Sequence, residues 1–301
     1  MPELPEVENV RMSLETLVSG KTISHVSVRL PRIIRQPENP RDFEEELRGR
    51  RIEGVSRRGK YLLFAVPPYT LVSHLRMEGR YALAASPSEA LQPHTHVLFD
   101  LSDGTQLRYR DVRQFGTMDL ILDTDPLPKG VSELGPEPFD ENLTSRVFHR
   151  LLAQRQAPIK AVLLDQNVLA GLGNIYVDES LFYAGLHPQQ AANTVSKQKA
   201  ATLLVMIRQV LSRAIDAGGS SIKSYVDGYG RHGGFQIELA VYGREGQPCV
   251  RCGGPIRKTR VAGRGTHFCP KCQKLRKQTR MRQQSGTSGQ ATIRAGKRVV
   301  E

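Results

Sequence analysis

All four cysteines of this 301-residue chain fall between positions 249 and 272, in two Cys-x-x-Cys pairs separated by sixteen residues. Each pair can place two sulfurs on one ion, and four thiolates form the closed tetrahedral set of a structural zinc site. Cys249, Cys252, Cys269 and Cys272 are therefore the predicted ligands of one structural zinc ion, and no organic cofactor is expected. Two disulfides or free thiols are the alternatives, although a secreted disulfide-bonded protein would spread its cysteines more widely.

The segment between the cysteine pairs has the length of a β-hairpin and is basic, with Arg257, Lys258, Arg260 and Arg264. The whole chain is basic too, with a formal net charge of +13 and a pI near 9.8. This charge points to a polyanion, and nucleic acid is favoured over a membrane because no basic amphipathic helix with a large apolar face is evident. The hairpin is expected to contact phosphate; a solvated charged hairpin is the alternative.

The chain shows no sign of membrane insertion or export. No stretch approaches the ~20 apolar residues needed to span a bilayer, and no apolar signal region follows Met1. A cytoplasmic protein without a membrane partner is the expectation.

The chain begins Met-Pro-Glu-Leu-Pro-Glu. Methionine aminopeptidases remove Met1 when the next side chain is small, which would leave Pro2 with a secondary α-amine. Such amines titrate near pKa ~8, so a neutral fraction can attack a sugar aldehyde carbon and form a Schiff base. Glu3 would lie close enough for general acid–base work. The plainer interpretation is the start of a helix, since Pro5 and Glu6 suit a first helical turn.

Hydrophobic patterning predicts a helix at the start, strands up to about residue 122 and helices after residue 141. Val7, Val10, Leu14 and Leu17 have helical spacing. The predicted strands include 23–28, 61–64, 70–77 and the hairpin 97–109, with a short helix near 43–47, a pattern typical of a sandwich or flattened barrel. Later helices are predicted at 142–153, 158–166, 175–183 (with Asn174 as N-cap) and 196–217, followed by a loop at 218–234 and a strand at 235–241.

Six short motifs occur in order along the chain: Pro2-Glu3-Leu4-Pro5-Glu6-Val7-Glu8, Arg58-Gly59-Lys60, His74-Leu75-Arg76-Met77-Glu78-Gly79, Arg113-Gln114-Phe115-Gly116, Gly171-Leu172-Gly173-Asn174-Ile175-Tyr176-Val177-Asp178-Glu179 and Gly263-Arg264-Gly265-Thr266-His267-Phe268-Cys269-Pro270. Any one motif is weak, but six in order after a terminal proline are highly specific. Over residues 2–273 the chain resembles the bacterial formamidopyrimidine-DNA glycosylase family.

The resemblance implies an α+β fold and a bifunctional enzyme of DNA repair. The fold would be an N-terminal β-sandwich with an N-terminal helix, a helical helix–two-turn–helix domain and a C-terminal zinc-finger hairpin. The corresponding parts are the catalytic β-sandwich domain (2–123), a linker (124–141), the DNA-binding domain (142–235) with its lesion-reading loop (218–234), the zinc finger (236–282) and a disordered basic tail (283–301). The partner would be double-stranded DNA with oxidised bases or abasic sites, bound by a monomer near the bacterial nucleoid.

Catalytic roles at the chain start also follow from the resemblance. Pro2 would attack C1′ of an oxidised purine nucleoside and expel the base, and β,δ-elimination would then cut the strand. Glu3 would shuttle protons at the sugar. Glu6 lies nearby in the family, and supporting the first helix explains it equally well. Lys60 and Arg264 resemble the family's phosphate-binding and catalytic cations, although a lysine after a glycine turn is more often simply solvated.

The resemblance assigns DNA contacts to residues that each have a plainer structural interpretation. Asn174, at a helix N-terminus, and His74 would contact phosphate; helix capping and an internal strand hydrogen bond are the alternatives. Met77 and Phe115 would fill the vacated base stack, and core packing is the alternative. Arg113 would bind the estranged cytosine; if its segment is extended, it and Phe115 face the same way.

The resemblance also assigns the reading of the lesion, and the chain departs from the family pattern at one position. Ser220 and main-chain groups up to about Tyr225 would contact the extruded base. Gln114 stands where the family commonly has a basic residue, which removes one possible phosphate contact. The alternatives are an endonuclease VIII-like enzyme for oxidised pyrimidines, whose chains usually have glycine where this one has Leu4, and a non-catalytic zinc-finger DNA-binding protein that would need neither Pro2 nor Glu3.

The C-terminal tail has no counterpart in typical family chains, and residues 271–301 hold nine Lys or Arg against the single acid Glu301. We predict that truncation after Gln284 weakens DNA binding at low salt. It should also flatten the dependence of log affinity on log salt by about one unit for each phosphate that the tail no longer neutralises. Titrations of one duplex at several salt concentrations test this, and an unchanged affinity and slope would contradict it.

Overall fold

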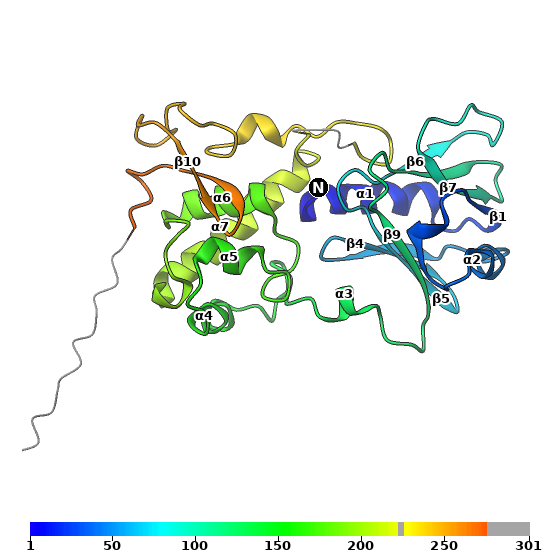
Figure 1. Cartoon of the computed structure of the whole chain (residues 1–301), viewed down its shortest axis with the longest axis horizontal. Coiled ribbons are helices and arrows are strands. Elements are labelled where there is room, and N and C mark those ends of the chain that lie inside the picture. The colour runs from blue at the N-terminus through cyan, green and yellow to red at the C-terminus, as the bar shows by residue number, and fades with distance from the viewer. Residues whose placement is uncertain (222–225, 276–301) are drawn as a thin grey trace, which may run out of the picture.

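The computed structural model describes residues 1–221 and 226–275 and places two halves side by side (Figure 1). The chain starts in the middle of the molecule, from where helix α1 (Leu4–Val18) runs into the half that contains the sheets. Glu3 is the N-cap of α1, and the Glu6 carboxylate accepts a hydrogen bond from the Glu3 backbone N–H at 2.7 Å. This reciprocal cap and Pro5 in the first turn favour helix initiation at this point.

The N-terminal half contains two sheets with orders β2-β9-β5-β4-β3 and β1-β7-β8-β6. Only β2 and β9 pair in parallel; the other neighbours are antiparallel. The strands are β1 (Ile23–Val28), β2 (Ile34–Gln36), β3 (Gly54–Arg58), β4 (Tyr61–Val66), β5 (Tyr69–His74), β6 (Arg80–Ala84), β7 (Thr95–Leu101), β8 (Gln106–Arg110) and β9 (Thr117–Leu122). Two short helices, η1 (Pro31–Ile33) and α2 (Pro40–Leu47), lie between β1 and β3. The predicted β-sandwich with an N-terminal helix is confirmed.

The strand predicted at 70–77 was too long, because β5 ends at His74. The His74 ring Nδ1 accepts a hydrogen bond from the Arg76 backbone N–H at 2.8 Å, and the Gly79 N–H donates to the Leu75 carbonyl at 2.9 Å. Arg76 has a positive φ of 52°. These bonds close a turn that carries Met77 away from the sheet.

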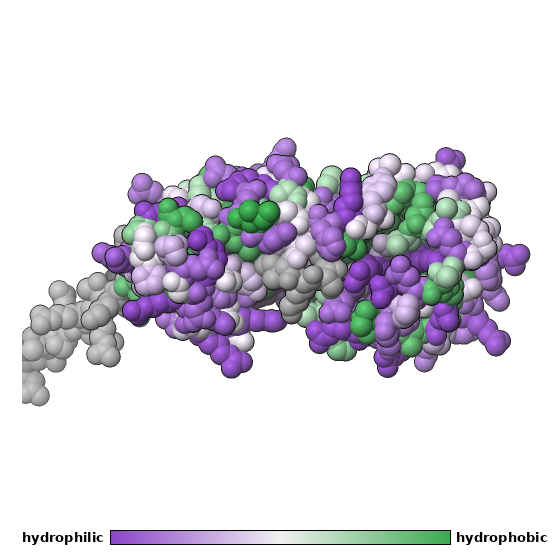
Figure 2. Space-filling view, turned by 90° about the horizontal axis from the view of Figure 1, so that it is seen from above, coloured by the Kyte–Doolittle hydropathy of each residue, from purple (hydrophilic) through white to green (hydrophobic). Residues whose placement is uncertain are grey.

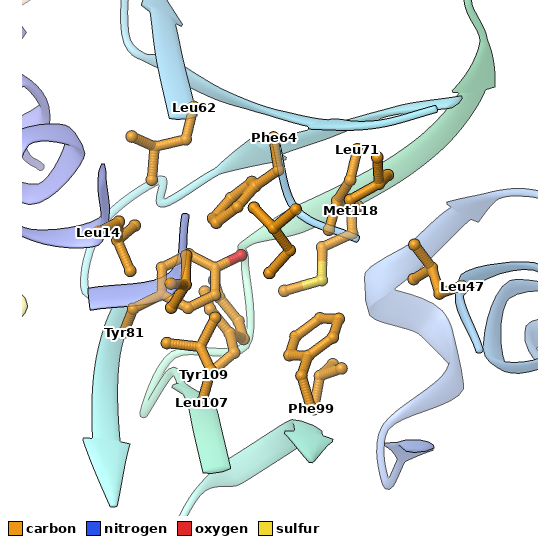
Figure 3. Close-up of a cluster of buried hydrophobic side chains, with 14 of the residues drawn as sticks. Leu14, Leu47, Leu62, Phe64, Leu71, Tyr81, Phe99, Leu107, Tyr109 and Met118 are labelled. Atoms are coloured by element: carbon orange, nitrogen blue, oxygen red, sulfur yellow. The ribbon is translucent and has the colours of Figure 1, made fainter. Parts of the chain in front are cut away.

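Apolar side chains from α1 and both sheets fill the space between the sheets (Figure 3). Leu14 of α1 lies in one cluster with Phe64, Tyr81 and Phe99, which are all buried. Each such side chain contributes about 1.5–3 kcal/mol of burial free energy. Packing against this cluster fixes where the start of α1 points.

The segment between the halves is anchored to the sheets. The Arg57 guanidinium donates two hydrogen bonds of 2.9 Å to the Glu137 carboxylate and a third, of 2.8 Å, to Glu8 of α1. Such two-pronged arginine–carboxylate pairs are among the stronger polar contacts. The segment also contains the short helix α3 (Lys129–Ser132), so the predicted linker has structure of its own.

The second half is helical, as predicted, and its helices share one apolar core. They are α4 (Ser145–Ala153), α5 (Ile159–Leu164), α6 (Asn174–Ala184), η2 (Ala192–Thr194) and α7 (Lys197–Asp216). The Ser196 side chain caps α7 by accepting from Lys199 N. Within the described residues no helix combines the length and apolar character needed to cross a membrane. Figure 2 shows hydrophilic residues over much of the visible face of both halves.

The hairpin β10 (Arg257–Val261) and β11 (Arg264–Phe268) follows this helical half, but the strand predicted at 235–241 is wrong. Phe235–Glu238 forms the 3-10 helix η3. The Glu179 carboxylate of α6 accepts hydrogen bonds from the backbone N–H groups of Ala240, Val241 and Tyr242 at 2.8–2.9 Å. These donors are satisfied by a side chain rather than by a neighbouring strand.

A buried ion pair joins the helices to the hairpin. Lys160 of α5 donates to Asp178 of α6 at 2.7 Å, and both side chains are fully buried. Lys160 also donates to the Gly265 carbonyl at 3.1 Å, while Asp178 accepts from the His267 N–H at 2.8 Å. Each charge is thus paired and also bound to the hairpin backbone.

We predict that Asp178→Asn destabilises the fold by about 3–5 kcal/mol, because it leaves the Lys160 charge buried without a partner. Adding Lys160→Met should recover part of this loss, since the introduced amide oxygen can still accept from His267. Thermal unfolding of both variants measures the difference, and the exposed pair Lys129–Glu133, disrupted by Glu133→Gln, is the matched control with little expected effect. A double variant less stable than Asp178→Asn alone would contradict this account.

Candidate active site

A cavity of about 450 Å³ opens between the two halves at the start of the chain. Its lining unites residues of the N-terminal segment, the β-sandwich, the 164–175 segment, the loop after α7 and the basic hairpin. The lining residues are Met1, Pro2, Glu3, Glu6, Val10, Lys60, Leu75, Met77, Glu78, Gly79, Arg80, Leu164, Gln166, Leu172, Gly173, Asn174, Ile175, Ser220, Val226, Tyr242 and Arg264. Eight residues singled out from the sequence therefore share one cavity: Pro2, Glu3, Glu6, Lys60, Met77, Asn174, Ser220 and Arg264.

The Glu3 carboxylate joins the chain start to helix α6. It accepts hydrogen bonds from the backbone N–H groups of Ile175 at 3.0 Å and Tyr176 at 3.4 Å. These are unpaired donors of the first turn, so Glu3 satisfies them and its charge is favourable at the positive end of α6. Asn174 was predicted as the N-cap of this helix, which is wrong: Gly173 is the N-cap and makes no side-chain cap bond.

Close backbone approach makes this junction possible. The Leu4 N–H donates to the Gly171 carbonyl at 3.0 Å. A Cβ at Gly173 would lie 2.3 Å from the Glu3 carboxyl carbon, and one at Gly171, where φ is +94°, would lie 2.5 Å from a Leu4 methyl. Only glycine leaves room for these two side chains.

Lys60 is a buried group, so its interpretation as a solvated surface charge is wrong. It follows the Gly59 turn, is 5% exposed and donates from Nζ to the Leu172 carbonyl at 2.6 Å. Burial lowers the pKa of Lys60, while the Glu3 and Glu6 carboxylates oppose that shift and Arg264 adds to it. Burial likewise raises the pKa of Glu3, against which Lys60 acts. Burial thus brings the pKa values of Lys60 and Glu3 closer together.

Glu6 of α1 contacts both α6 and the loop after α7. Its carboxylate accepts from the backbone N–H groups of Glu3 at 2.7 Å and Ser220 at 2.8 Å, and from the Tyr176 hydroxyl. Burial, with the nearby Glu3 charge adding to it, raises the pKa of Glu6 to about 7. These contacts make Glu6 a structural link between α1, α6 and the loop after α7.

Three of the residues predicted to contact phosphate, Arg264, Asn174 and His74, lie in different environments. Arg264 at the start of β11 is exposed and faces the cavity. Asn174 donates from Nδ2 to the Gly265 carbonyl at 3.0 Å, and its buried Oδ1 has no hydrogen-bond partner within the described residues. His74 is buried outside the cavity lining, and burial with nearby cations lowers its pKa to about 3, so the ring is neutral and forms the internal hydrogen bond to Arg76.

Arg113 and Phe115 lie outside the cavity lining, on an adjacent turn. Phe115 is 53% exposed, so core packing does not explain it. The prediction assumed an extended segment. The segment instead turns at Gln114, which has a left-handed φ of 57°. The two side chains nevertheless meet: the Arg113 guanidinium carbon lies 4.9 Å from the centre of the Phe115 ring. Met77, which lines the cavity, is half-buried.

The loop predicted to read the lesion is described only in part. Ser220 is buried at the cavity wall, and its hydroxyl has no hydrogen-bond partner within residues 1–221 and 226–275. Tyr225 and the basic tail at 283–301 lie outside the described residues.

The four cysteine sulfurs lie within 4.8 Å of one another and form no disulfide. The backbone N–H of Arg251 points at the Cys249 sulfur at 3.4 Å, as suits a thiolate. Four clustered thiolates of this kind fit a closed tetrahedral zinc site. Zinc would hold the two ends of the β10–β11 hairpin together and so fix the base from which Arg264 projects.

Several residues that organise the site were not predicted from the sequence, above all Lys160, Asp178 and Asp111. A signal for Lys160 was present, because it is a single charge within the apolar run of α5, Ile159–Leu164. Asp178 occurs inside one of the six motifs. Their pairing joins elements that are distant in sequence, which local patterning does not reveal.

Family models match nearly the whole described chain. The formamidopyrimidine-DNA glycosylase N-terminal domain matches residues 1–118, and the formamidopyrimidine-DNA glycosylase H2TH domain matches residues 134–226. The zinc finger found in FPG and IleRS matches residues 246–275, which contain all four cysteines.

Curated relatives and solved structures agree with these matches. The chain is 51% identical over 276 residues to formamidopyrimidine-DNA glycosylase of Bacillus subtilis, covering 91% of this chain and 99% of that protein. It is 50% identical over 275 residues to the Bacillus licheniformis protein of the same name, covering 91% and 100%. A structure of Lactococcus lactis Fpg with abasic-site DNA is 43% identical, with a TM-score of 0.84 and coverage of 90% and 99%. A complex of that protein with N7-benzyl-Fapy-dG DNA also gives 0.84 at 43% identity, with coverage of 91% and 100%.

The raised pKa of Glu6 gives a pH test of the link between α1, α6 and Ser220. Folding raises this pKa from 4.5 to about 7, so the folded protein binds the proton more tightly than the unfolded chain. The resulting stabilisation is present below pH 4.5 and is lost as the pH rises to about 7. We predict that the melting temperature of the unaltered protein falls over this range relative to Glu6→Gln. Parallel melting curves against pH would contradict the assignment.

Proposed function

The chain belongs to the formamidopyrimidine-DNA glycosylase family, and from this premise we propose how its residues carry out the two activities of that family. It is a bifunctional DNA glycosylase and abasic-site lyase of base excision repair, and its macromolecular partner is damaged DNA. The observation that carries the residue assignments is the cavity between the halves, in which Pro2 and Glu3 lie with Lys60, Asn174 and Arg264.

Pro2 is the proposed nucleophile once Met1 has been removed. Its neutral amine nitrogen forms a bond to C1′ while the glycosidic bond breaks and the base leaves with the electron pair and a proton. The bound nitrogen loses its proton, its lone pair then breaks the C1′–O4′ bond, and O4′ takes up a proton, which opens the sugar ring and leaves a Schiff base. This Schiff base acidifies the sugar protons. Loss of the C2′ proton then breaks the C3′–O bond, and a second elimination breaks the C5′–O bond, so the strand is cut on both sides. Pro2 is buried at the cavity wall, which supports this assignment.

Glu3 and Lys60 are the proposed proton-handling pair. Burial raises the pKa of Glu3 and lowers that of Lys60, which favours proton exchange near neutral pH. Glu3 is anchored on α6 through Ile175 and Tyr176, so the carboxylate stays beside Pro2. We propose that Glu3 moves protons at the sugar and that Lys60 also binds the phosphate next to the lesion.

The other assignments concern DNA binding. Asn174 and Arg264 would bind phosphate from the helical half, and a neutral His74 could act only as a hydrogen-bond donor through Nε2. Met77 and Phe115 would fill the space left by the extruded nucleotide, and Arg113 would bind the opposite base. The exposure of Phe115 and its contact with Arg113 support this role.

We propose that the preferred lesions are oxidised purines, read by Ser220 and nearby main-chain groups. The second candidate, an enzyme for oxidised pyrimidines, is less well supported because Leu4, where such enzymes usually have glycine, is buried against Gly171. We propose that the protein acts as a monomer, which the meeting of both halves of one chain at the cavity supports. We place its work at the bacterial nucleoid because its substrate is DNA.

Borohydride trapping with a duplex that contains 8-oxoguanine opposite cytosine tests the terminal-amine mechanism. We predict a covalent complex with the processed protein. We predict none with the unaltered sequence bearing an N-terminal extension, or with Pro2→Gly bearing the same extension, because an acylated nitrogen cannot attack. The extended protein should still bind the duplex.

Two comparisons complete the test. A duplex with an oxidised pyrimidine separates the two enzyme candidates by relative trapping rate. Turnover by the extended form would refute the terminal amine as nucleophile, and absence of trapping with correctly processed protein would favour a non-catalytic DNA-binding protein.

A further inference from the structure

Asp111 is a buried carboxylate at the end of β8, and it organises the turn that carries Arg113 and Phe115. The side chain is fully buried. Its Oδ1 accepts from the Arg113 N–H at 3.1 Å, and its Oδ2 accepts from the N–H groups of Phe115 at 2.9 Å and Gly116 at 2.8 Å. Hydrogen bonds to a charged acceptor contribute more than neutral ones, so three donors on one carboxylate make a rigid turn.

The Asp111 backbone fastens the turn to the sheet. Its N–H donates to the His94 carbonyl at 3.0 Å, and its carbonyl accepts from His96 Nε2 at 2.9 Å and from the Gln114 N–H at 3.2 Å. Gln114 holds a left-handed φ of 57°, which non-glycine residues rarely adopt without such support. The geometry that places Arg113 over the Phe115 ring therefore depends on Asp111.

Tyr109 connects this turn to the separate turn that carries Met77. Its side chain is fully buried, and a Cβ built on Gly116 would lie only 1.7 Å from its hydroxyl oxygen. A Cβ on Gly79 would lie 2.3 Å from the same oxygen. The hydroxyl therefore fills the gap between the two turns, although it has no hydrogen-bond partner within the described residues.

We propose that Asp111 and Tyr109 are positioning residues that hold Arg113, Phe115 and Met77 in one fixed arrangement, so that reading the opposite base and filling the vacated stack act as a single unit. This inference rests on the DNA-contact roles proposed above for those three side chains. Neither positioning residue lines the catalytic cavity.

A fixed arrangement matters for base extrusion and much less for chemistry at an abasic site. Side chains that enter the stack must already be ordered, because ordering them on binding would subtract from affinity. An abasic nucleotide has no base to extrude, and Pro2, Glu3 and Lys60 are held by other contacts. Loosening the turn should therefore slow excision, weaken the preference for cytosine opposite the lesion, and spare cleavage of preformed abasic sites.

Asp111→Asn is the first variant, because an amide can accept only on one side and presents N–H groups to the other donors. The measurements are single-turnover excision of 8-oxoguanine opposite cytosine and opposite adenine, and cleavage of an abasic duplex. We expect excision opposite cytosine to fall by about tenfold, the ratio of the two excision rates to fall towards one, and abasic cleavage to change by less than about twofold.

Glu179→Gln is the matched control. Glu179 is also a buried carboxylate that accepts three backbone N–H groups, but it holds residues 240–242 in the other half. This variant can lower stability or all rates together, yet it should leave the cytosine-to-adenine ratio unchanged. A purely structural role for Asp111 would give the same pattern as this control.

A double-variant cycle and Tyr109→Phe complete the experiment. Asp111→Asn should add little to Phe115→Ala, because both remove the same positioned side chain. Tyr109→Phe removes only the hydroxyl that fills the gap between the two turns, so it should fold and yet lower the ratio. If Arg113→Ala and Phe115→Ala leave the ratio unchanged, the proposed contacts themselves are wrong. If those variants lower the ratio but Asp111→Asn and Tyr109→Phe preserve it, the positioning role is overturned. Where Asp111→Asn does not fold, an unchanged ratio in Tyr109→Phe alone overturns it.

Discussion

The Glu3 carboxylate, seated on the first turn of α6, is the contact on which the arrangement of the site depends. It accepts hydrogen bonds from the Ile175 and Tyr176 N–H groups. The helical half thus fixes the position of Pro2, although Pro2 lies just before α1 of the other half. Close to this contact, the Leu172 carbonyl accepts a hydrogen bond from Lys60 Nζ, and both residues line the cavity. Because Glu3 also joins the two halves, their placement is tied to the position of Pro2, the proposed nucleophile.

Buried carboxylates have a similar task elsewhere in the molecule. Glu6 joins α1 to Ser220, Asp178 joins α6 to the hairpin, and Glu179 holds residues 240–242. Glu6 and Glu179 accept main-chain N–H groups from segments outside the sheets, whereas Asp178 binds β11, which also pairs with β10. A buried carboxylate that accepts several main-chain N–H groups can impose one conformation on such a segment where apolar packing would allow several. Hydrogen bonds to buried carboxylates therefore hold the segments near the cavity, and apolar burial holds the two large cores.

Local sequence signals predicted much of the fold. The spacing of Val7, Val10 and Leu14 predicted α1, and the cysteine spacing predicted a cluster of four thiolates, because both depend on periodicity within a short stretch. The strand predicted at 235–241 failed because Glu179, some sixty residues earlier, satisfies the backbone of that segment. Asn174 was wrongly predicted as the N-cap of α6, because Glu3, at the start of the chain, supplies the oxygen that accepts from the first turn of this helix. The sequence motifs contain many of the cavity-lining residues, but they also contain His74, Arg113 and Phe115, which lie outside the lining. The burial of Lys60 and the turn at Arg113 required three-dimensional contacts.

The bond between Leu4 and Gly171 also sets an order of events during synthesis. Pro2 and Glu3 become buried only when residues 171–176 are available to receive them, and at about 5–20 residues per second the ribosome needs roughly 10–30 s to reach that point. Throughout that interval the chain start is an unanchored peptide, open to the peptidase that must expose the proline. Afterwards Pro2 is buried, while Met1 stays 46% exposed. Translation speed thus sets how long the chain start stays unburied before residues 171–176 cover Pro2.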